Sequence, residues 1–319
     1  MSQINQTTVS EFIIQGISEY PELQNFLFIV LLLIYLVTLM ANLAIITVAC
    51  VDSLLHTPMY FFLCNLSLLD MCYTTVTLHK VLLSFSTGNN TISFISCMVQ
   101  LYFFTAFACT EFFLLTVMAY DRYVAICRPL HYMVVMNKKV CCLLSVVSWT
   151  IGFLDTMTYP ILTSQLSFCG SNEIKHFFCD LTALLKLSCS DTSIIEVLLL
   201  IEGVLFGACP FLLTLMSYVF IISTIMKIHS VEGRRKAFST CSSHLTVVVL
   251  FYGTIMFTYM TPTSMLSLNQ NKLFAMLYTT VIPMLNPIIY SLKNKQVKNA
   301  FMKVIINVSF WHTKSSHVF

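Results

Sequence analysis

The chain has 319 residues, of which 57% are hydrophobic and only 10% are charged. Soluble domains carry charge on about a quarter of their residues, so this composition excludes an ordinary soluble protein and predicts an integral membrane protein. The net charge of +3 comes from dispersed cations, which excludes a nucleic-acid-binding surface as the expected function.

Residues 1–25 are polar and acidic, and they lack the basic start and short apolar core of a cleaved signal peptide. We therefore expect an extracellular N-terminal segment and a first helix that acts as its own signal anchor. Asn5-Gln6-Thr7 matches the glycosylation sequon, so Asn5 is the expected glycosylation site.

Seven apolar stretches are long enough for helices that cross about 30 Å of hydrocarbon. They have no strict alternation, which favours helices over barrel strands. The predicted fold is an all-α membrane protein, a seven-transmembrane helix bundle that forms one domain over residues 1–303. The expected spans are 26–50, 58–80, 97–121, 140–161, 194–226, 238–261 and 272–292.

Orientation follows from the Lys and Arg residues, which concentrate on the cytoplasmic side of membrane proteins. An extracellular N-terminus places 13 of the 17 Lys and Arg residues inside, and an odd number of spans then makes residues 304–319 a cytoplasmic tail. Residues 293–302 combine Val297, Ala300 and Phe301 on one face with surrounding lysines. This pattern predicts a short amphipathic helix on the inner membrane surface.

Of the 13 cysteines, nine fall in predicted helices or cytoplasmic loops, where they suit packing roles. The other four are predicted to be extracellular, where disulfides persist, and their spacing leaves three pairings open. Three of them lie in the long segment 162–193. We call this segment the lid, because disulfides would hold it over the outer mouth of the bundle. The four cysteines are Cys97, Cys169, Cys179 and Cys189.

Asp121-Arg122-Tyr123 closes the third span at its predicted cytoplasmic end. A membrane-boundary arginine is costly unless it is paired, so Asp121 is the expected resting partner of Arg122. Near the inner end of the seventh span, Pro287 should kink the helix and Asn286 can bond the carbonyl that the proline frees, with Tyr290 as a mobile polar group. Together these residues predict a conformational switch.

Two carboxyl groups, Asp70 and Glu111, lie at similar depth near the middle of the membrane, where ionisable residues are expensive and usually functional. Asn42 and Asn286 could complete a polar cluster with them. Three interpretations stay open: a cation site, a protonated hydrogen-bond network, or a proton or ion path.

The outer halves of several spans combine aromatic, small and polar side chains, which together suit a pocket for a compact ligand. The candidate ligand-binding residues are Phe104, Thr105, Ala108, Cys109 and Phe112 on the third span, Glu202, Gly203 and Phe206 on the fifth, and Tyr252, Ile255 and Tyr259 on the sixth.

The sequence contains no arrangement that supports catalysis. It has no nucleophile elbow, no His pair with metal-ligand spacing and no phosphate-binding Gly loop. We expect a receptor and not an enzyme. The second class of function that the carboxyl groups allow is an ion channel or transporter.

Five motifs are spread along the chain: PMYFFLCNLSLLD (58–70), MAYDRYVAICRPLHY (118–132), SY (217–218), KAFSTCSSH (236–244) and PMLNPIIY (283–290). In these motifs the chain resembles the rhodopsin-like G-protein-coupled receptors, and among them the vertebrate odorant receptors, from about residue 5 to residue 303. It departs from the family pattern at Ala41, where Gly is usual, and at Thr182-Ala183, where prolines are often found.

The resemblance implies that small volatile odorants are the ligands and that the olfactory stimulatory heterotrimeric G protein is the partner, with cyclic AMP as the product of signalling. It implies the plasma membrane of sensory cilia as the location. It also implies that Arg122 is released on activation beside Tyr218 and Tyr290, that Cys97 pairs with Cys179 and Cys169 with Cys189, and that sodium or a proton sits at Asp70 and Glu111. No other cofactor is expected.

Overall fold

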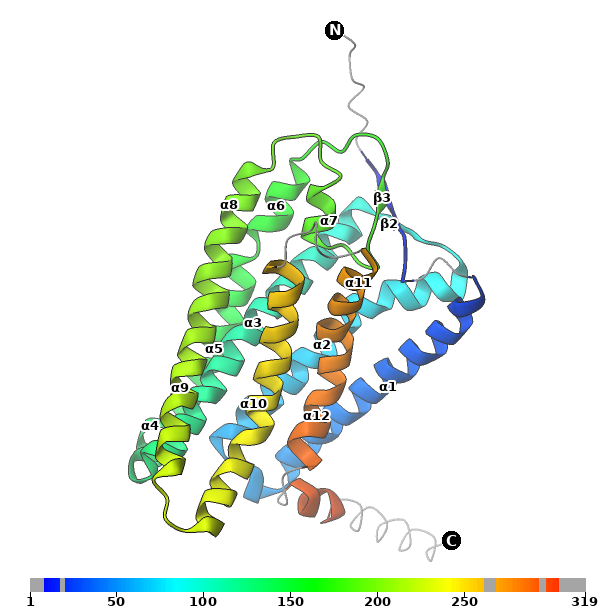
Figure 1. Ribbon diagram of the computed structural model, residues 1–319. Coiled ribbons are helices and arrows are strands. Elements are labelled where there is room, and N and C mark those ends of the chain that lie inside the picture. The colour runs from blue at the N-terminus through cyan, green and yellow to red at the C-terminus, as the bar shows by residue number, and fades with distance from the viewer. Residues whose placement is uncertain (1–8, 18–20, 261–267, 293–296, 304–319) are drawn as a thin grey trace, which may run out of the picture.

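The computed structural model describes residues 9–17, 21–260, 268–292 and 297–303. Within them, seven helical stretches are long and apolar enough to cross a membrane, and they pack as one bundle (Figure 1). The chain is therefore the seven-helix membrane protein that its sequence predicts. Asn5 and the tail 304–319 lie outside the described residues.

The bundle helices are α1 (Pro21–Val51), α2 (Pro58–Thr87), α3 (Phe94–Cys127), α5 and α6 (Lys138–Asp155 and Thr158–Ser164), α8 and α9 (Ser193–Glu202 and Cys209–Met226), α10 (Val231–Met260), and α11 and α12 (Leu268–Met276 and Ile282–Leu292). π-Helical turns at Gly203–Ala208 and Leu277–Val281 connect α8 to α9 and α11 to α12. Short helices lie at Ser53–Leu55, Pro129–His131, α4 (Tyr132–Val135) and α7 (Leu181–Leu185). We call the end of the bundle that carries α7 the lid end, and the opposite end the Arg122 end.

Several helices extend beyond the predicted spans. α3 continues to Cys127, α2 to Thr87, and α10 already begins at Val231. Apolar composition predicts only the part of a helix that lies in hydrocarbon, whereas caps determine where the helix ends. The Ser93 side chain accepts a hydrogen bond from the Ser96 amide at the start of α3, and Gly88 ends α2 with a φ of 70°.

A small sheet at the lid end adds to the predicted helical bundle. Strand β1 (Glu11–Ile14) lies between β2 (Thr91–Ser93) and β3 (Glu173–Ile174), antiparallel to β2 and parallel to β3. Its side chains alternate between exposed and buried, with Phe12 and Ile14 buried. We predicted no strand here because four residues are too short a stretch for this alternation to stand out from a polar segment.

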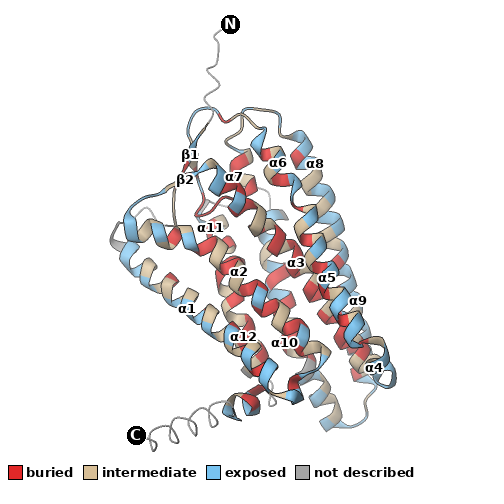
Figure 2. Ribbon diagram, turned by 180° about the vertical axis from the view of Figure 1, so that it is seen from behind, coloured by how far each residue is buried: buried red, intermediate tan, exposed pale blue. Residues whose placement is uncertain are grey.

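Helix α3 is the central helix of the bundle and packs against α2, α5 and α9. Figure 2 shows buried residues along much of its length, whereas α1 is mostly half-buried or exposed. Helices α3 and α5 approach each other closely at Gly152. A Cβ on this glycine would lie 2.1 Å from Thr110 Oγ1 and 2.8 Å from the Ala106 carbonyl oxygen.

After α12, residues 297–303 are helical. Val297 and Ala300 are buried, whereas Lys298 and Asn299 are exposed. The described part of this segment therefore has the two faces expected of the amphipathic helix. Lys303 Nζ reaches Asp52 Oδ2 at 3.2 Å, which connects this segment to the loop after α1.

Candidate functional site

Arg122 is held by its neighbour at the end of α3. Its Nε and Nη2 atoms donate to Asp121 Oδ2 at 3.0 and 2.5 Å. Asp121 is fully buried and Arg122 is 9% exposed. Separating a buried ion pair leaves an uncompensated charge, so this contact opposes any outward movement of the guanidinium group.

A third residue, Tyr132, completes this contact from the loop after α3. Its hydroxyl donates to Asp121 Oδ1 at 2.8 Å, so both carboxylate oxygens have partners. Burial and the neighbouring Asp121 raise the pKa of the Tyr132 hydroxyl, which keeps the donor proton in place. Sequence reasoning did not include Tyr132 among the switch residues, although it ends the 118–132 motif.

His244 on α10 connects three helices at the Arg122 end. Its Nε2 atom is 3.1 Å from the Leu115 carbonyl oxygen on α3, and its Nδ1 atom is 2.6 Å from the Tyr218 hydroxyl on α9. A carbonyl can only accept, so Nε2 carries the proton and Tyr218 donates to Nδ1. We also missed His244 as a site residue, although the sequence places this histidine inside a helix.

The other predicted switch residues lie close to this network. Tyr123 is half-buried, and its ring centroid is 6.0 Å from that of Phe220. Tyr290 is 4% exposed, and its hydroxyl has no hydrogen-bond partner among the described residues. A buried hydroxyl without a partner gains from any rearrangement that supplies one, which suits a residue that moves.

Pro287 lies inside α12 and has no backbone N–H, so one carbonyl of this helix lacks its helical hydrogen bond. Asn286 does not bond this carbonyl, contrary to our prediction. The carbonyl four residues before Pro287 belongs to Pro283, and Asn42 Nδ2 on α1 donates to it at 3.1 Å. Asn286 Nδ2 instead lies 3.1 Å from each carboxylate oxygen of Asp70. The reason is geometric: a neighbouring helix can reach the exposed carbonyl, while Asn286 faces α2.

Asp70, Glu111, Asn42 and Asn286 are all at most 1% exposed. Asp70 accepts from Asn286 and lies close enough to Glu111 for their charges to interact. Neither carboxylate oxygen of Glu111 has a hydrogen-bond partner among the described residues. A buried carboxyl group without hydrogen-bond partners requires either a proton or a nearby cation. The cluster could therefore hold either one.

At the lid end, one disulfide joins the lid to α3 and a second closes a loop within the lid. Cys97 pairs with Cys179, and Cys169 with Cys189. Gln100 supports the first disulfide, because its Nε2 donates to the Val76 carbonyl at 2.8 Å and its Oε1 accepts from the Cys179 amide at 2.9 Å. The lid is therefore joined to both α3 and α2.

The lid also contributes side chains that sequence reasoning missed. Phe178 is fully buried, and its ring centroid is 4.6 Å from that of Phe104. Asp180 Oδ2 accepts from the Tyr259 hydroxyl at 3.1 Å. Burial lowers the pKa of His176 to about 4, so this histidine is neutral at physiological pH. In the sequence, the HFFCD stretch at residues 176–180 was the pattern from which these lid residues could have been predicted.

The predicted ligand residues form two neighbouring groups. Phe112 packs edge-on against Tyr252, with ring centroids 5.2 Å apart, while Phe104 and Ala108 pack in a second cluster beneath the lid. Ile255 contacts both clusters. The Tyr259 hydroxyl lies 2.9 Å from that of Tyr278 on the seventh span.

Along the fifth span, Glu202 accepts a hydrogen bond from Tyr159 on α6. The ring of Phe206 lies 5.7 Å from that of Phe113. Gly203 is exposed, and no atom lies within 4 Å of where its Cβ would be. The structure thus joins Glu202 and Phe206 to neighbouring helices, whereas the Cα of Gly203 faces open space. On α3, Thr105 is half-buried and Cys109 is buried.

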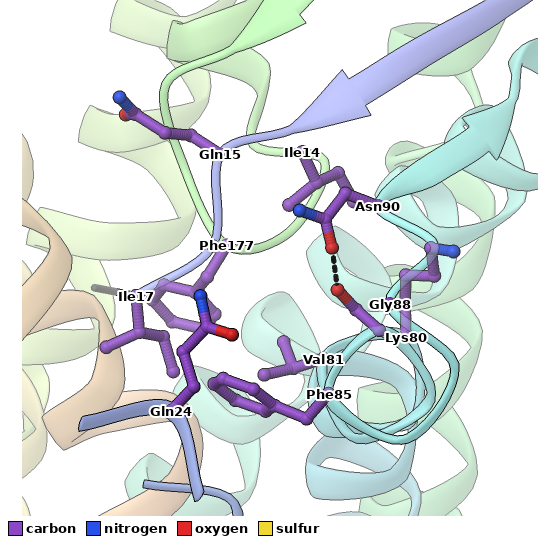
Figure 3. A pocket seen from close by; sticks show the side chains of 12 residues that line it. Ile14, Gln15, Ile17, Gln24, Lys80, Val81, Phe85, Gly88, Asn90 and Phe177 are labelled. Carbon is purple, nitrogen blue, oxygen red and sulfur yellow. Dashed lines mark hydrogen bonds between the residues drawn. The ribbon is translucent and has the colours of Figure 1, made fainter. Parts of the chain in front are cut away.

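A separate cavity of about 230 Å³ lies beside the lid-end parts of α1 and α2. Figure 3 shows Val81, Phe85, Ile17 and Phe177 around it, with Asn90 accepting from Ser84 at its rim. None of the predicted ligand residues lines this cavity. It is lined by Ile14, Gln15, Gly16, Ile17, Gln24, Lys80, Val81, Ser84, Phe85, Gly88, Asn90 and Phe177.

Comparison with known proteins assigns the family. Residues 31–308 match the family model described as olfactory receptor. The chain belongs to the olfactory receptor family. It is 50% identical over 311 residues to mouse olfactory receptor 5AR1, covering 96% of this chain and 98% of that one. It is 49% identical over 310 residues to human olfactory receptor 1F1, covering 97% and 99%.

The family assignment confirms the interpretation made from the sequence motifs. This olfactory receptor is a multi-pass protein of the plasma membrane, and it belongs to a receptor family that is not enzymatic. Odorant ligands and G-protein coupling are general to the family.

Proposed function

We propose that this olfactory receptor binds a small volatile organic molecule beneath the lid and activates the olfactory stimulatory G protein at the Arg122 end, which raises cyclic AMP. The observation that carries the proposal is the path of α3. This helix contacts the lid through Phe104 and Phe178 at one end and holds the Asp121–Arg122 pair at the other.

The proposed binding region lies among Phe104, Phe112, Tyr252, Ile255 and Tyr259. Aromatic and aliphatic side chains supply apolar contact, and the Tyr259 hydroxyl can orient a polar group. A ligand here would touch α3 and α10, and these helices carry Arg122 and His244 at their other ends. Ligand binding can therefore bias the contacts of both residues.

The proposed orientation places the lid end outside the cell and the tail in the cytoplasm, in the membrane of sensory cilia. Two disulfides at the lid end support this orientation, since disulfides persist in oxidising compartments. Glycosylation at Asn5 would be on the same side.

Cyclic AMP measured in cells that express the chain tests the coupling. Arg122→Ala should abolish the response to an activating odorant while surface expression is retained. Arg128→Ala is the matched control, because Arg128 is exposed just beyond α3. An unchanged response in Arg122→Ala would contradict the coupling role. A ligand-evoked current without any G protein would support a channel instead.

We also propose that Asp70 and Glu111 hold a sodium ion or share a proton in the resting state. Glu111 supports this, because its buried oxygens have no other partners among the described residues. Sodium should raise the thermal stability of the purified receptor relative to the same concentration of the larger cation N-methylglucamine, and Glu111→Gln should remove the difference. An equal response to both cations favours the proton.

A further inference from the structure

The cavity of about 230 Å³ at the lid end is separate from the proposed binding region. Its walls come from four parts of the chain: the end of β1 and the residues after it, the beginning of α1, the end of α2 with the following loop, and the lid. In Figure 3, Lys80 and Asn90 lie on one side of the cavity, and Ile17 and Phe177 lie on the other. A cavity of about 150 Å³ is large enough for benzene, so this one has room for a ligand of at least about six non-hydrogen atoms.

Hydrogen bonds fix the walls of this cavity. The Ile14 amide donates to the Asn90 carbonyl at 2.9 Å, which joins β1 to the loop after α2. Lys272 Nζ donates to the Gly16 carbonyl at 2.9 Å, which joins the chain after β1 to α11. Walls that are already ordered lose little entropy when a ligand binds, and most small-molecule sites are preformed in this way.

Part of the wall is apolar. Phe177 is fully buried and Val81 is 4% exposed, while Ile17 and Phe85 are half-buried. These side chains come from the lid, from α2 and from the chain after β1. A surface of this kind binds an aliphatic chain through the hydrophobic effect.

The polar part of the wall offers hydrogen-bond donors. Half-buried Lys80 donates to the Asn89 carbonyl at 3.1 Å and makes no other hydrogen bond or ion pair with the described residues. An ammonium group has three donors, so two of them are unused. Asn90 Oδ1 accepts from Ser84, but its Nδ2 atom has no partner within the described part of the chain.

The charge of the wall selects among ligand classes. None of the residues that line the cavity is Asp or Glu, and Lys80 is the cation among them. An amine would therefore meet a like charge and no acceptor of opposite charge. Water alone would leave the apolar part of the wall facing molecules that cannot bond to it. A ligand with an anionic head and a short apolar tail matches both parts of the wall.

We propose that this cavity is a second ligand site, which binds a small aliphatic carboxylate. The two carboxylate oxygens would accept from Lys80 Nζ and Asn90 Nδ2. The alkyl chain would pack against Val81, Phe85 and Phe177.

The second site would act on the proposed binding region through the lid. The ring centroid of Phe177 lies 4.9 Å from that of Phe178, which in turn lies 4.6 Å from that of Phe104. A carboxylate packed against Phe177 would hold this row of rings in place and so favour the closed lid over a bound odorant. This effect rests on the proposed function, whereas the binding of the carboxylate does not.

The first experiment measures the thermal stability of the purified full-length receptor. Butanoate and hexanoate are compared with butanol and hexanol, because a ligand that binds only the folded receptor raises its stability. We expect half-maximal stabilisation at a concentration about 10- to 100-fold lower for each carboxylate than for the alcohol of the same chain length, since a charged hydrogen bond replaces a neutral one. Equal concentrations, or no stabilisation by either carboxylate, would overturn the proposal.

Variants test whether the carboxylate binds in this cavity and not in the proposed binding region. Lys80→Gln should remove the advantage of the carboxylate over the alcohol. Lys186→Gln is the control, because Lys186 is an exposed lysine at the lid end that does not line the cavity. Full stabilisation by hexanoate in Lys80→Gln would refute the site. If Lys80→Gln does not fold, Ile17→Phe replaces it: the larger ring takes up part of the cavity and should weaken hexanoate binding, and unchanged binding there would also refute the site.

Cyclic AMP in cells tests the effect on the odorant response. Hexanoate at a saturating concentration should lower the half-maximal concentration of a neutral odorant about fivefold or more, in the wild type and in Lys186→Gln but not in Lys80→Gln. Stabilisation by hexanoate without this shift supports the site and contradicts its action through Phe177. Stabilisation by hexanoate with no cyclic AMP response to any odorant supports the site and contradicts the proposed function.

Discussion

At the scale of single residues, the polar side chains at the Arg122 end form two separate contacts. In the first, Arg122 and Tyr132 occupy the two oxygens of Asp121. In the second, His244 joins Tyr218 to α3. Both contacts are buried, so losing either one leaves a buried polar group without its hydrogen bond, which destabilises the resting state.

Tyr132→Phe removes the hydroxyl that donates a hydrogen bond to Asp121 Oδ1. We expect the resting state to lose about 1 kcal/mol, which raises basal cyclic AMP about fivefold. The measurement is cyclic AMP without ligand, normalised to surface expression. Tyr120→Phe is the control, since Tyr120 is 42% exposed. Basal activity equal to that of the control would show that this hydrogen bond does not stabilise the resting state.

At the scale of elements, the packing of α3 against α5 depends on a glycine. Apolar periodicity predicts that both helices exist, but it does not predict how closely they approach. Gly152 allows α5 to contact the backbone of α3 at Ala106 and the side chain of Thr110. This close approach places the C-terminal end of α5 beside the lid-end half of α3.

Gly152→Ala should destabilise the receptor by about 1–3 kcal/mol, because the added methyl group meets backbone atoms that cannot move away easily. Thermal unfolding of the purified receptor measures the loss. In Gly253→Ala the same change is made where no atom lies within 4 Å of the Cβ position, and there we expect no loss. Equal stability of the two variants would mean that α5 shifts at little cost.

At the scale of the whole molecule, the lid end and the Arg122 end are joined by α3 and α10. If ligand binding favours the state that couples to the G protein, linkage requires that the G protein raises ligand affinity by the same factor. The two ends are then one allosteric system, with Phe104 and Arg122 on the same helix.

We therefore expect agonist affinity to rise about 5- to 150-fold when the purified receptor is bound to its G protein. Arg122→Ala should remove this increase and leave the affinity of the free receptor unchanged. Radioligand or thermophoretic binding with and without G protein provides the measurement. An increase that persists in Arg122→Ala would assign the coupling to other contacts.

The sequence by itself determined the membrane class, the seven helices and the family, because apolar length and the motifs around Arg122 and Pro287 are local signals. The Asp121–Arg122 pair also follows from adjacency. Only the tertiary structure decided which distant groups meet. Asn42 bonds the carbonyl freed by Pro287, because helix packing sets contacts that spacing along one helix cannot predict. The short strand β1 likewise forms only because β2 and β3 supply its hydrogen bonds.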